Sequence, residues 1–261
     1  MSLVPPHPPF DPNRIRVYWQ PGCTSCLRTK EFLTGQGIDY DSVNAQANPQ
    51  AREELRRLGA RSLPVVSLGE RYTLCQSFGD VLRFLNLDMK LLPDPLPGPE
   101  LMRKLDMVLG AAARFTRQFP DDALRVQFRE RMRTIGDTCF HTFRVAEMAL
   151  DPCEGRPFSN AGFTDLAPAD WKFKDIADWG LKVRDRVGAW WARQPPTDLR
   201  YKVETYYGRR DLLDVMDRTT YHAAQHARQL MLMLDSLGIP PDRPLTMEDL
   251  KGVPVPEAAW G

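Results

Sequence analysis

The spacing of apolar positions changes character about one third of the way along the chain. Up to residue 87, short β-branched and aromatic runs of strand length alternate with segments that follow the helical period. From residue 100 onward, the apolar positions follow the 3.6-residue period over much longer stretches. The pattern predicts an α/β region followed by an all-α region.

The α/β region reads as β-α-β-α-β-β-α. The expected elements are a strand at 15–19, a helix at 25–37, a strand at 38–45, a helix at 48–60, a hairpin within 63–74 and a helix at 78–87. Asn48 is placed to cap the second helix, with Pro49 in its first turn, and Gly69 is placed at the turn of the hairpin.

Four long amphipathic stretches follow. They cover residues 100–119, 123–150, 171–194 and 210–238. In the second stretch, Leu124, Phe128, Met132, Ile135 and Val145 stand at helical spacing. The fourth stretch ends at Gly238, ahead of Ile239 and two prolines, which is a strong stop signal. Four such helices predict a four-helix bundle.

A proline-rich segment separates the two regions. Four prolines stand between Pro93 and Pro99, where the chain cannot continue a helix and will be stiff. We therefore expect a disordered lead-in at 1–13, an α/β domain at 14–88, a linker at 89–99 and a helical domain at 100–261.

Composition and charge narrow the function. A hydrophobic fraction of 43% and a charged fraction of 26% are typical of a soluble globular protein. The formal net charge of +1 disfavours nucleic acid or an anionic membrane surface as partner. No apolar run reaches membrane-spanning length, and the first residues lack the pattern of a signal peptide. Five irregularly spaced cysteines argue against a disulfide framework and predict a cytoplasmic location.

Cys23 and Cys26 form a C-x-x-C pair at the expected start of the first helix. Structural zinc needs four ligands, and no second such pair exists, since Cys75, Cys139 and Cys153 stand singly. A redox pair has a clear physical basis, because a helix N-terminus favours the thiolate and a cysteine one turn on can resolve a mixed disulfide. Zinc binding and two ordinary core cysteines stay as alternatives.

The segment C-T-S-C-L-R-T-K resembles the C-P-Y-C-x-R-x-K motif of glutaredoxins, and the element order with L-P-V-V at 63–66 resembles the thioredoxin-like fold. The resemblance implies that Cys23 is the nucleophile, that Cys26 resolves the mixed disulfide, and that Leu63 with a cis Pro64 contacts the substrate backbone. It also implies a low-molecular-weight thiol such as glutathione as cosubstrate. Two positions differ from the family pattern: Gln20 stands where a Lys or Arg is usual, and C-Q-S-F-G-D at 75–80 replaces the glutathione-anchoring glycines.

Three of the four histidines stand in the expected bundle helices. His222 and His226 are four residues apart, so they share a helix face with Val215, Thr219, Met233 and Leu237. His141 is expected to face inward from the second helix, with Asp137 on its side as a hydrogen-bond partner and Cys139 turned away. Three imidazoles from two helices match a metal site with an open position, whereas each alone would be an ordinary core histidine.

The segments T-I-G-D-T-C-F-H at 134–141 and Y-H-A-A-Q-H-A-R-Q-L at 221–230 resemble the second and fourth helices of the DinB-like superfamily. The likeness covers about residues 100–255. It implies that His141, His222 and His226 bind one divalent metal ion, with zinc first and nickel, manganese or iron as alternatives; Gln229 belongs to the motif. Characterised DinB-like enzymes include thiol-dependent isomerases and S-transferases, and the resemblance also allows a homodimer.

Together the two resemblances imply a thiol-linked metalloprotein. Its Cys23–Cys26 pair would act as a thiol-disulfide oxidoreductase on a small thiol and its mixed disulfides. Its metal site would activate a low-molecular-weight thiol for S-transfer or detoxification. The alternative is a glutaredoxin-like reductase whose bundle is a non-catalytic, metal-dependent binding or structural module.

Overall fold

The computed structural model describes residues 11–194 and 198–261, and the chain divides into two compact units. The first unit runs to Asp94 and includes Trp260 and Gly261, and the second comprises Pro95–Ala259. Most of the predicted lead-in, with His7, lies outside the described residues. Its last part is ordered, because the backbone N–H groups of Asn13 and Arg14 donate to the side chain and carbonyl of Asp11.

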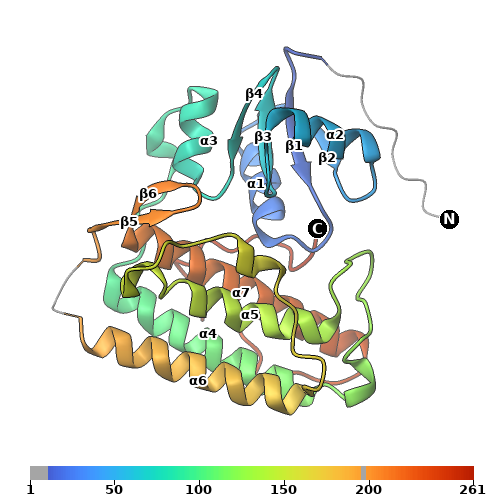
Figure 1. Cartoon of the computed structure of the whole chain (residues 1–261), viewed down its shortest axis with the longest axis vertical. Helices are drawn as coiled ribbons and strands as arrows, with labels where there is room; N and C mark the ends of the chain where they lie inside the picture. The colour runs from blue at the N-terminus through green and yellow to red at the C-terminus, as the bar shows by residue number, and fades with distance from the viewer. Residues whose placement is uncertain (1–10, 195–197) are drawn as a thin grey trace. The chain divides into compact units, whose positions relative to one another are not determined.

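The first unit is a four-stranded mixed sheet with three helices, as the sequence predicts (Figure 1). Its elements are β1 (Ile15–Trp19), α1 (Thr24–Gly35), β2 (Asp41–Asn44), α2 (Pro49–Leu58), β3 (Val65–Leu68), β4 (Arg71–Leu74) and α3 (Phe78–Leu85). The strand order is β2-β1-β3-β4, with β1 parallel to β2 and antiparallel to β3. Asn48 caps α2 by accepting from the backbone N–H groups of Gln50 and Ala51.

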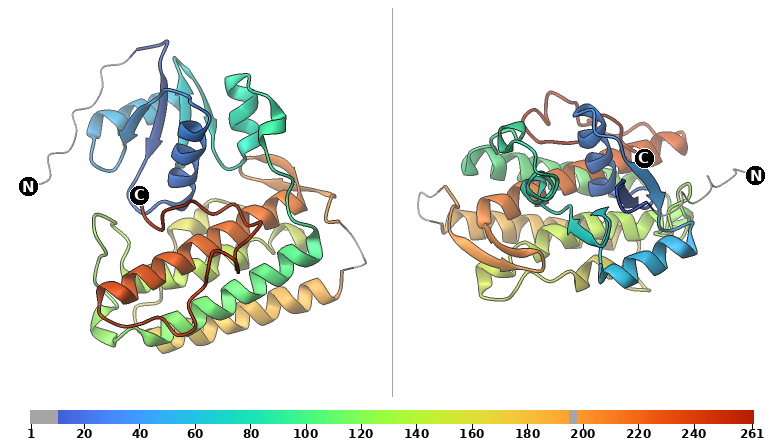
Figure 2. Two further views of the ribbon diagram at one scale, coloured as in Figure 1. Left: turned by 180° about the vertical axis from the view of Figure 1, so that it is seen from behind. Right: turned by 90° about the horizontal axis from the view of Figure 1, so that it is seen from above.

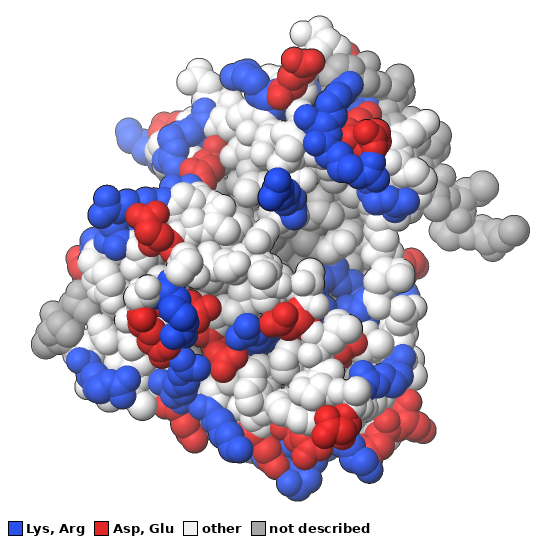
Figure 3. Space-filling model, viewed as in Figure 1, with Lys and Arg blue, Asp and Glu red and all other residues white. Residues whose placement is uncertain are grey.

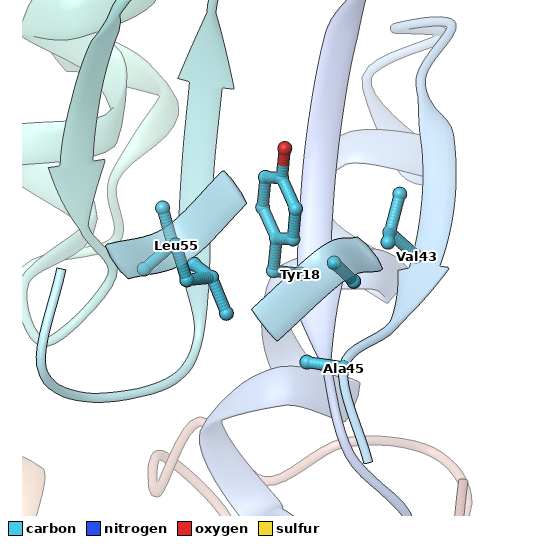
Figure 4. Packing of buried hydrophobic residues seen from close by; sticks show 6 residues of the cluster. Tyr18, Val43, Ala45 and Leu55 are labelled. Carbon is cyan, nitrogen blue, oxygen red and sulfur yellow. The ribbon is translucent and has the colours of Figure 1, made fainter. Parts of the chain in front are cut away.

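Alternating residues of the central strands build a separate core on each face of this sheet. On one face Tyr18 packs against Leu55 of α2 and Val43 of β2 (Figure 4). On the other, Val17 and Val66 pack in a cluster with residues of α1 and α3. Because side chains alternate across a strand, this two-sided burial explains why apolar residues stand at both odd and even positions of β1 and β3.

A buried ion pair lies on the α2 side of the same sheet. Arg16 is 1% exposed, and its Nη1 donates to Glu54 Oε2 over 2.8 Å. The Tyr18 hydroxyl donates to the same carboxylate oxygen, also over 2.8 Å. Glu54 therefore balances the charge of a guanidinium that has almost no access to water.

The second unit is a four-helix bundle (Figures 1 and 2). Its helices are α4 (Gly98–Gln118), α5 (Ile135–Met148), α6 (Phe173–Ala192) and α7 (Leu212–Ser236). Helices α4 and α5 each pack mainly against α6 and α7. A short 3-10 helix η1 (Met89–Leu91) precedes the bundle. Helix α4 begins within the predicted linker, with Pro99 in its first turn, where a missing N–H costs nothing.

The prediction of one helix over 123–150 is wrong in its first half. Residues 124–134 form a loop that turns back on itself, with Arg129 at a φ of 52° and a bridge between Gln127 and Thr134. Thr134 caps α5 by accepting from the N–H of Asp137. Met132, expected in the core, is 68% exposed. The loop fits because Gly136 approaches Leu124 so closely that a Cβ would lie 2.6 Å from its side chain.

The described residues of the second unit also contain a β-hairpin and three short 3-10 helices that the sequence pattern did not predict. The hairpin pairs β5 (Lys202–Thr205) with β6 (Gly208–Asp211) directly before α7. The short helices are η2 (Asp121–Ala123), η3 (Pro152–Glu154) and η4 (Ala161–Thr164).

Charges of both signs are interspersed over the face seen in Figure 3. Among the helices of the described residues, none combines the length and the apolar composition needed to cross a bilayer.

Candidate functional site

Cys23 and Cys26 lie at the start of α1 and are joined in a disulfide. Cys23 is the N-cap residue, and the backbone N–H of Cys26 donates to its Sγ over 3.2 Å. Gly22, with a φ of 64°, makes the turn from β1 into the helix in a conformation that glycine adopts readily. Cys23 is half-buried and Cys26 is 1% exposed, so Cys23 is the more accessible of the two residues.

The Leu63–Pro64 peptide is cis and lies at the same end of the sheet as the dithiol. Register places Tyr18 opposite Val65, so the end of β1 that leads to Cys23 meets the start of β3. The Leu63 carbonyl accepts a hydrogen bond from Gln76 Nε2 over 3.3 Å. The Pro64 carbonyl accepts one from the Cys75 N–H over 3.2 Å. The C-Q-S segment that departs from the glutaredoxin pattern thus contacts this peptide directly.

The remaining cysteines are poor nucleophiles. Burial raises the pKa of Cys75, Cys139 and Cys153 to about 12 in each case. Thr116 of α4 is close enough to act on the pKa of the Cys139 thiol, and Cys139 is not among the side chains that converge with His141. In the described part of the chain, no cysteine belongs to a group of side chains able to hold a metal ion.

His141 of α5 converges with His222 and His226 of α7 in the bundle interior. His222 Nε2 lies 3.0 Å from His226 Nε2 and 3.3 Å from His141 Nε2. Nitrogen ligands about 2.0–2.1 Å from a tetrahedral ion stand about 3.3 Å apart, which is close to these two distances, and all three donors lie within 4.8 Å of one another. On the shared α7 face Val215, Thr219 and Met233 are buried, while Leu237 is 42% exposed because the helix ends there.

One histidine is oriented by a neighbouring side chain. His226 Nδ1 lies 2.8 Å from Gln229 Oε1, so Nδ1 carries the proton and the Nε2 lone pair is directed at the other two rings. The expected partnership of Asp137 with His141 does not form. Asp137 accepts from the Thr134 hydroxyl and the Ala167 N–H, and His141 Nδ1 has no partner within the described residues.

The charges acting most on the three rings are positive. Burial is the largest cause that lowers the pKa of His141 and His222 well below the usual value and that of His226 to about 3. The guanidinium charges of Arg131 and Arg133 lower the pKa of all three rings further. The imidazoles are therefore neutral near pH 7, which is the form that binds metal.

Sequence reasoning missed the residues that surround these histidines. The Phe163 ring, from η4, lies 5.9 Å from the His141 ring and 6.2 Å from the His222 ring. Arg133 Nη2 donates to the Phe163 carbonyl over 2.8 Å, and the Arg218 guanidinium lies 5.2 Å from the Phe163 ring centroid. Arg218 stands four residues before His222, so helical spacing could have placed it on the same face of α7. The position of Arg133 was not predictable in this way, because the sequence pattern wrongly placed it within a helix.

Two protein families match separate parts of the chain. Residues 15–73 match the glutaredoxin family model, and residues 104–230 match the model of the DinB superfamily. The chain thus carries a glutaredoxin-like domain followed by a DinB-like domain. DinB proteins are generally metal-binding, and the three clustered histidines lie within the matched residues.

Several curated relatives match stretches of 53–57 residues of this chain. The glutaredoxin-like protein NrdH of Escherichia coli K12 is 39% identical over 57 residues, or 22% of this chain and 70% of NrdH. The gene 56 protein of Mycobacterium phage L5 is 45% identical over 53 residues, 20% of this chain and 52% of that protein. An uncharacterised glutaredoxin-like 8.6 kDa protein of Clostridium pasteurianum is 38% identical over 55 residues, 21% of this chain and 73% of its own length.

The chain therefore belongs to the glutaredoxin-like family through its first unit, although it spans only about half of the gene 56 protein. Similarity to NrdH and the Cys23–Cys26 pair together support a thiol-disulfide redox function.

Proposed function

We propose that the first unit is a dithiol-disulfide oxidoreductase in which Cys23 is the nucleophile and Cys26 the resolving cysteine. The observation that carries this assignment is the contrast between the two sulfurs. Cys23, half-buried at the helix N-terminus, accepts a hydrogen bond from the Cys26 N–H, while Cys26 is buried behind it. In the reduced protein, that hydrogen bond and the helix dipole stabilise a thiolate on Cys23.

The reaction proceeds by two thiol-disulfide exchanges. The Cys23 thiolate attacks one sulfur of a mixed disulfide, which joins that sulfur to Cys23 and releases the other as a thiolate. The Cys26 thiolate then attacks Cys23 Sγ, which closes the intramolecular disulfide and releases the reduced substrate. Two equivalents of a small thiol such as glutathione restore the dithiol and leave as the oxidised thiol. Leu63 and Pro64 would contact the substrate backbone.

Cysteine variants test this assignment. Cys23→Ser is expected to lower reduction of a glutathione mixed disulfide by about a hundredfold or more, because the nucleophile is lost. Cys26→Ser is expected to accumulate the mixed disulfide on Cys23, detectable by intact-mass spectrometry. Cys75→Ser is the matched control and keeps activity. Retention of reductase activity by Cys23→Ser refutes the proposal.

In the second unit, the proposed site binds one divalent metal ion through His141, His222 and His226, and zinc is the first candidate for that ion. A divalent ion on three neutral imidazoles keeps its full charge and lowers the pKa of a bound small thiol toward neutrality. The chain itself orients His226 through Gln229 and excludes water, since the three histidines are at most 7% exposed. The proposed activity is S-transfer from a low-molecular-weight thiol drawn from the pool that Cys23 and Cys26 serve. A reducing, cytoplasmic location follows from that pool.

That same burial favours a second candidate, in which the ion only stabilises the bundle or its binding surface. Structural zinc sites are closed, and these rings have very little access to solvent. Under this alternative, chelation lowers thermal stability, and small thiols do not reach the metal.

Metal analysis separates these possibilities. Protein purified without a histidine tag is expected to hold about one ion per chain, lost in His226→Ala and kept in the matched His7→Ala. Absence of metal in the unaltered protein refutes the site. Addition of glutathione to cobalt-loaded protein then decides the role: a change in the visible spectrum favours thiol chemistry, and no change with a large stability loss on chelation favours the structural role.

A further inference from the structure

Arg133 is held beside the three histidines with part of its hydrogen-bonding capacity unused. Its Nη2 donates to the Phe163 carbonyl over 2.8 Å, and the Phe163 ring flanks both His141 and His222. Its Nη1 is buried and has no hydrogen-bond partner among the described residues. A buried guanidinium N–H without an acceptor is costly, so a ligand that supplies one would be stabilised there.

Two further arginines add positive charge to the same region. Burial lowers the pKa of Arg133 to about 9, and the nearby positive charge of Arg131 adds to that lowering. Arg218 is 5% exposed and packs over the Phe163 ring. At neutral pH all three guanidiniums are charged, and each acts on the imidazole of His222.

Among the described residues, the histidine cluster contains no carboxylate, and one carboxylate, that of Asp137, contributes to the pKa of Arg133. Asp137 is the acidic residue that acts on Arg133, and its two oxygens already accept from Thr134 and Ala167. A divalent ion would add two more positive charges to this partly dry region, and such an excess is stable only when an anion enters with it.

From this geometry we infer that Arg133, supported by Arg131, forms a carboxylate-binding subsite beside the three histidines, and that the small molecule taken by the bundle is a thiol that also carries a carboxylate. The planar guanidinium presents paired N–H donors that match a carboxylate, and the thiol sulfur would then lie toward the imidazoles. Arg133 is a positioning and specificity residue. This inference rests on the proposed metal-thiol function of the bundle.

A pair of minimal thiols tests the subsite on the full chain loaded with cobalt. The two probes are 3-mercaptopropionate and 2-mercaptoethanol, which share the thiol and differ in the carboxylate. Binding is followed by the thiolate-to-cobalt absorption band. The unaltered protein is expected to bind 3-mercaptopropionate at least about tenfold more tightly than 2-mercaptoethanol, because the carboxylate adds one charge-assisted hydrogen-bonded pair.

Variants assign that preference to Arg133. Arg133→Met is expected to bring the ratio of the two dissociation constants close to one, because only 3-mercaptopropionate carries the carboxylate that Arg133 would hold. Arg133→Lys keeps the charge but loses the paired donors, so its ratio falls between the two. The matched control is Arg125→Met, an exposed arginine of the same loop that donates to the Ala169 carbonyl, and it keeps the full ratio. Cobalt content verifies that each variant is folded.

The possible outcomes separate this inference from the function on which it rests. Equal binding of the two thiols by the unaltered protein overturns the subsite and leaves the metal-thiol function standing. Retention of the full ratio in Arg133→Met overturns the assignment to Arg133. Binding of neither thiol by cobalt-loaded protein refutes the thiol chemistry of the bundle and the subsite with it.

Discussion

His226 and Gln229 form a hydrogen-bonded pair within a single turn of α7, with 2.8 Å between His226 Nδ1 and Gln229 Oε1. The amide oxygen accepts from the ring, which fixes the tautomer whose Nε2 lone pair points toward the other two imidazoles. Gln229 is therefore expected to affect metal binding without touching the ion itself.

We predict that Gln229→Leu weakens metal affinity by about 10–100-fold, because the ring loses its orientation and the hydrogen bond that raises its basicity. Competition with a chromophoric chelator measures this change. Gln225→Leu is the matched control: the residue is buried on the same helix, but its amide donates to the carbonyls of Ala258 and Ala259. Equal losses in the two variants would show that general destabilisation, and not the orientation of His226, is responsible.

The cysteines are expected to differ sharply in reactivity. After reduction, iodoacetamide at pH 8 should modify Cys23 first, because a thiol with a pKa of about 12 is only about one part in ten thousand thiolate at that pH. Raising the pH by one unit multiplies that small fraction about tenfold, since the pH stays below the pKa. Peptide mapping by mass spectrometry reads out each site.

Cys23→Ser serves as the control and should show very slow labelling at the remaining single cysteines. Cys153 gives the sharpest check, because it is only half-buried and its pKa is raised first by burial and then by the charges of Glu154 and Asp151. Modification of Cys153 at the rate of Cys23 would contradict the prediction.

Local signals predicted most of the fold. Asn48 before Pro49 placed the start of α2, and Gly69 placed the turn between β3 and β4. The failure at residues 124–134 arose because apolar residues at helical spacing outweighed a capping signal, Thr134 followed three residues later by Asp137. The close approach of Gly136 to Leu124 is a tertiary contact, and no local pattern predicts it.

Some residues of the candidate site were also predictable from local sequence, and others were not. His222 and His226 share a face through helix geometry alone, so their convergence was predictable. The position of Arg133 depends on Phe163, which lies thirty residues further along in a segment without periodicity. Long-range contacts of this kind bring charge to a site in ways that spacing does not show.

The pair of Arg16 and Glu54 is expected to be important for the stability of the first unit. Glu54→Gln leaves a guanidinium that is 1% exposed without its nearest full counter-charge, so we predict a loss of about 2–3 kcal/mol in the free energy of unfolding. Glu53→Gln is the adjacent control: its partner Arg56 is on the surface, and the loss should stay within about 0.5 kcal/mol. Calorimetry, with hydrogen exchange of β1 amides to identify the transition, measures both. A loss below that of Glu53→Gln would show that the buried pair contributes nothing.

Two glycines of α6 test the packing that positions α5. A Cβ on Gly180 would lie 2.6 Å from the ring of Phe143, whereas a Cβ on Gly188 would meet nothing within 4 Å. Gly180→Ala is therefore expected to destabilise the bundle by about 1–3 kcal/mol through overpacking. Gly188→Ala should stabilise it by about 0.5–1 kcal/mol, because alanine favours the helix. The urea midpoint followed by tryptophan fluorescence compares the two, since Trp179 of α6 stacks on Phe140 at 4.6 Å.

The same pair of variants connects bundle packing to the histidine cluster. Phe143 stands two residues after His141 on α5, so a shift of the Phe143 ring away from the methyl group added in Gly180→Ala would move the backbone that carries His141. Gly180→Ala is thus expected to weaken metal affinity, and Gly188→Ala to leave it unchanged. If Gly180→Ala stabilises the bundle as much as Gly188→Ala, then Phe143 does not pack against α6 in this way, and the placement of His141 against α7 loses its support.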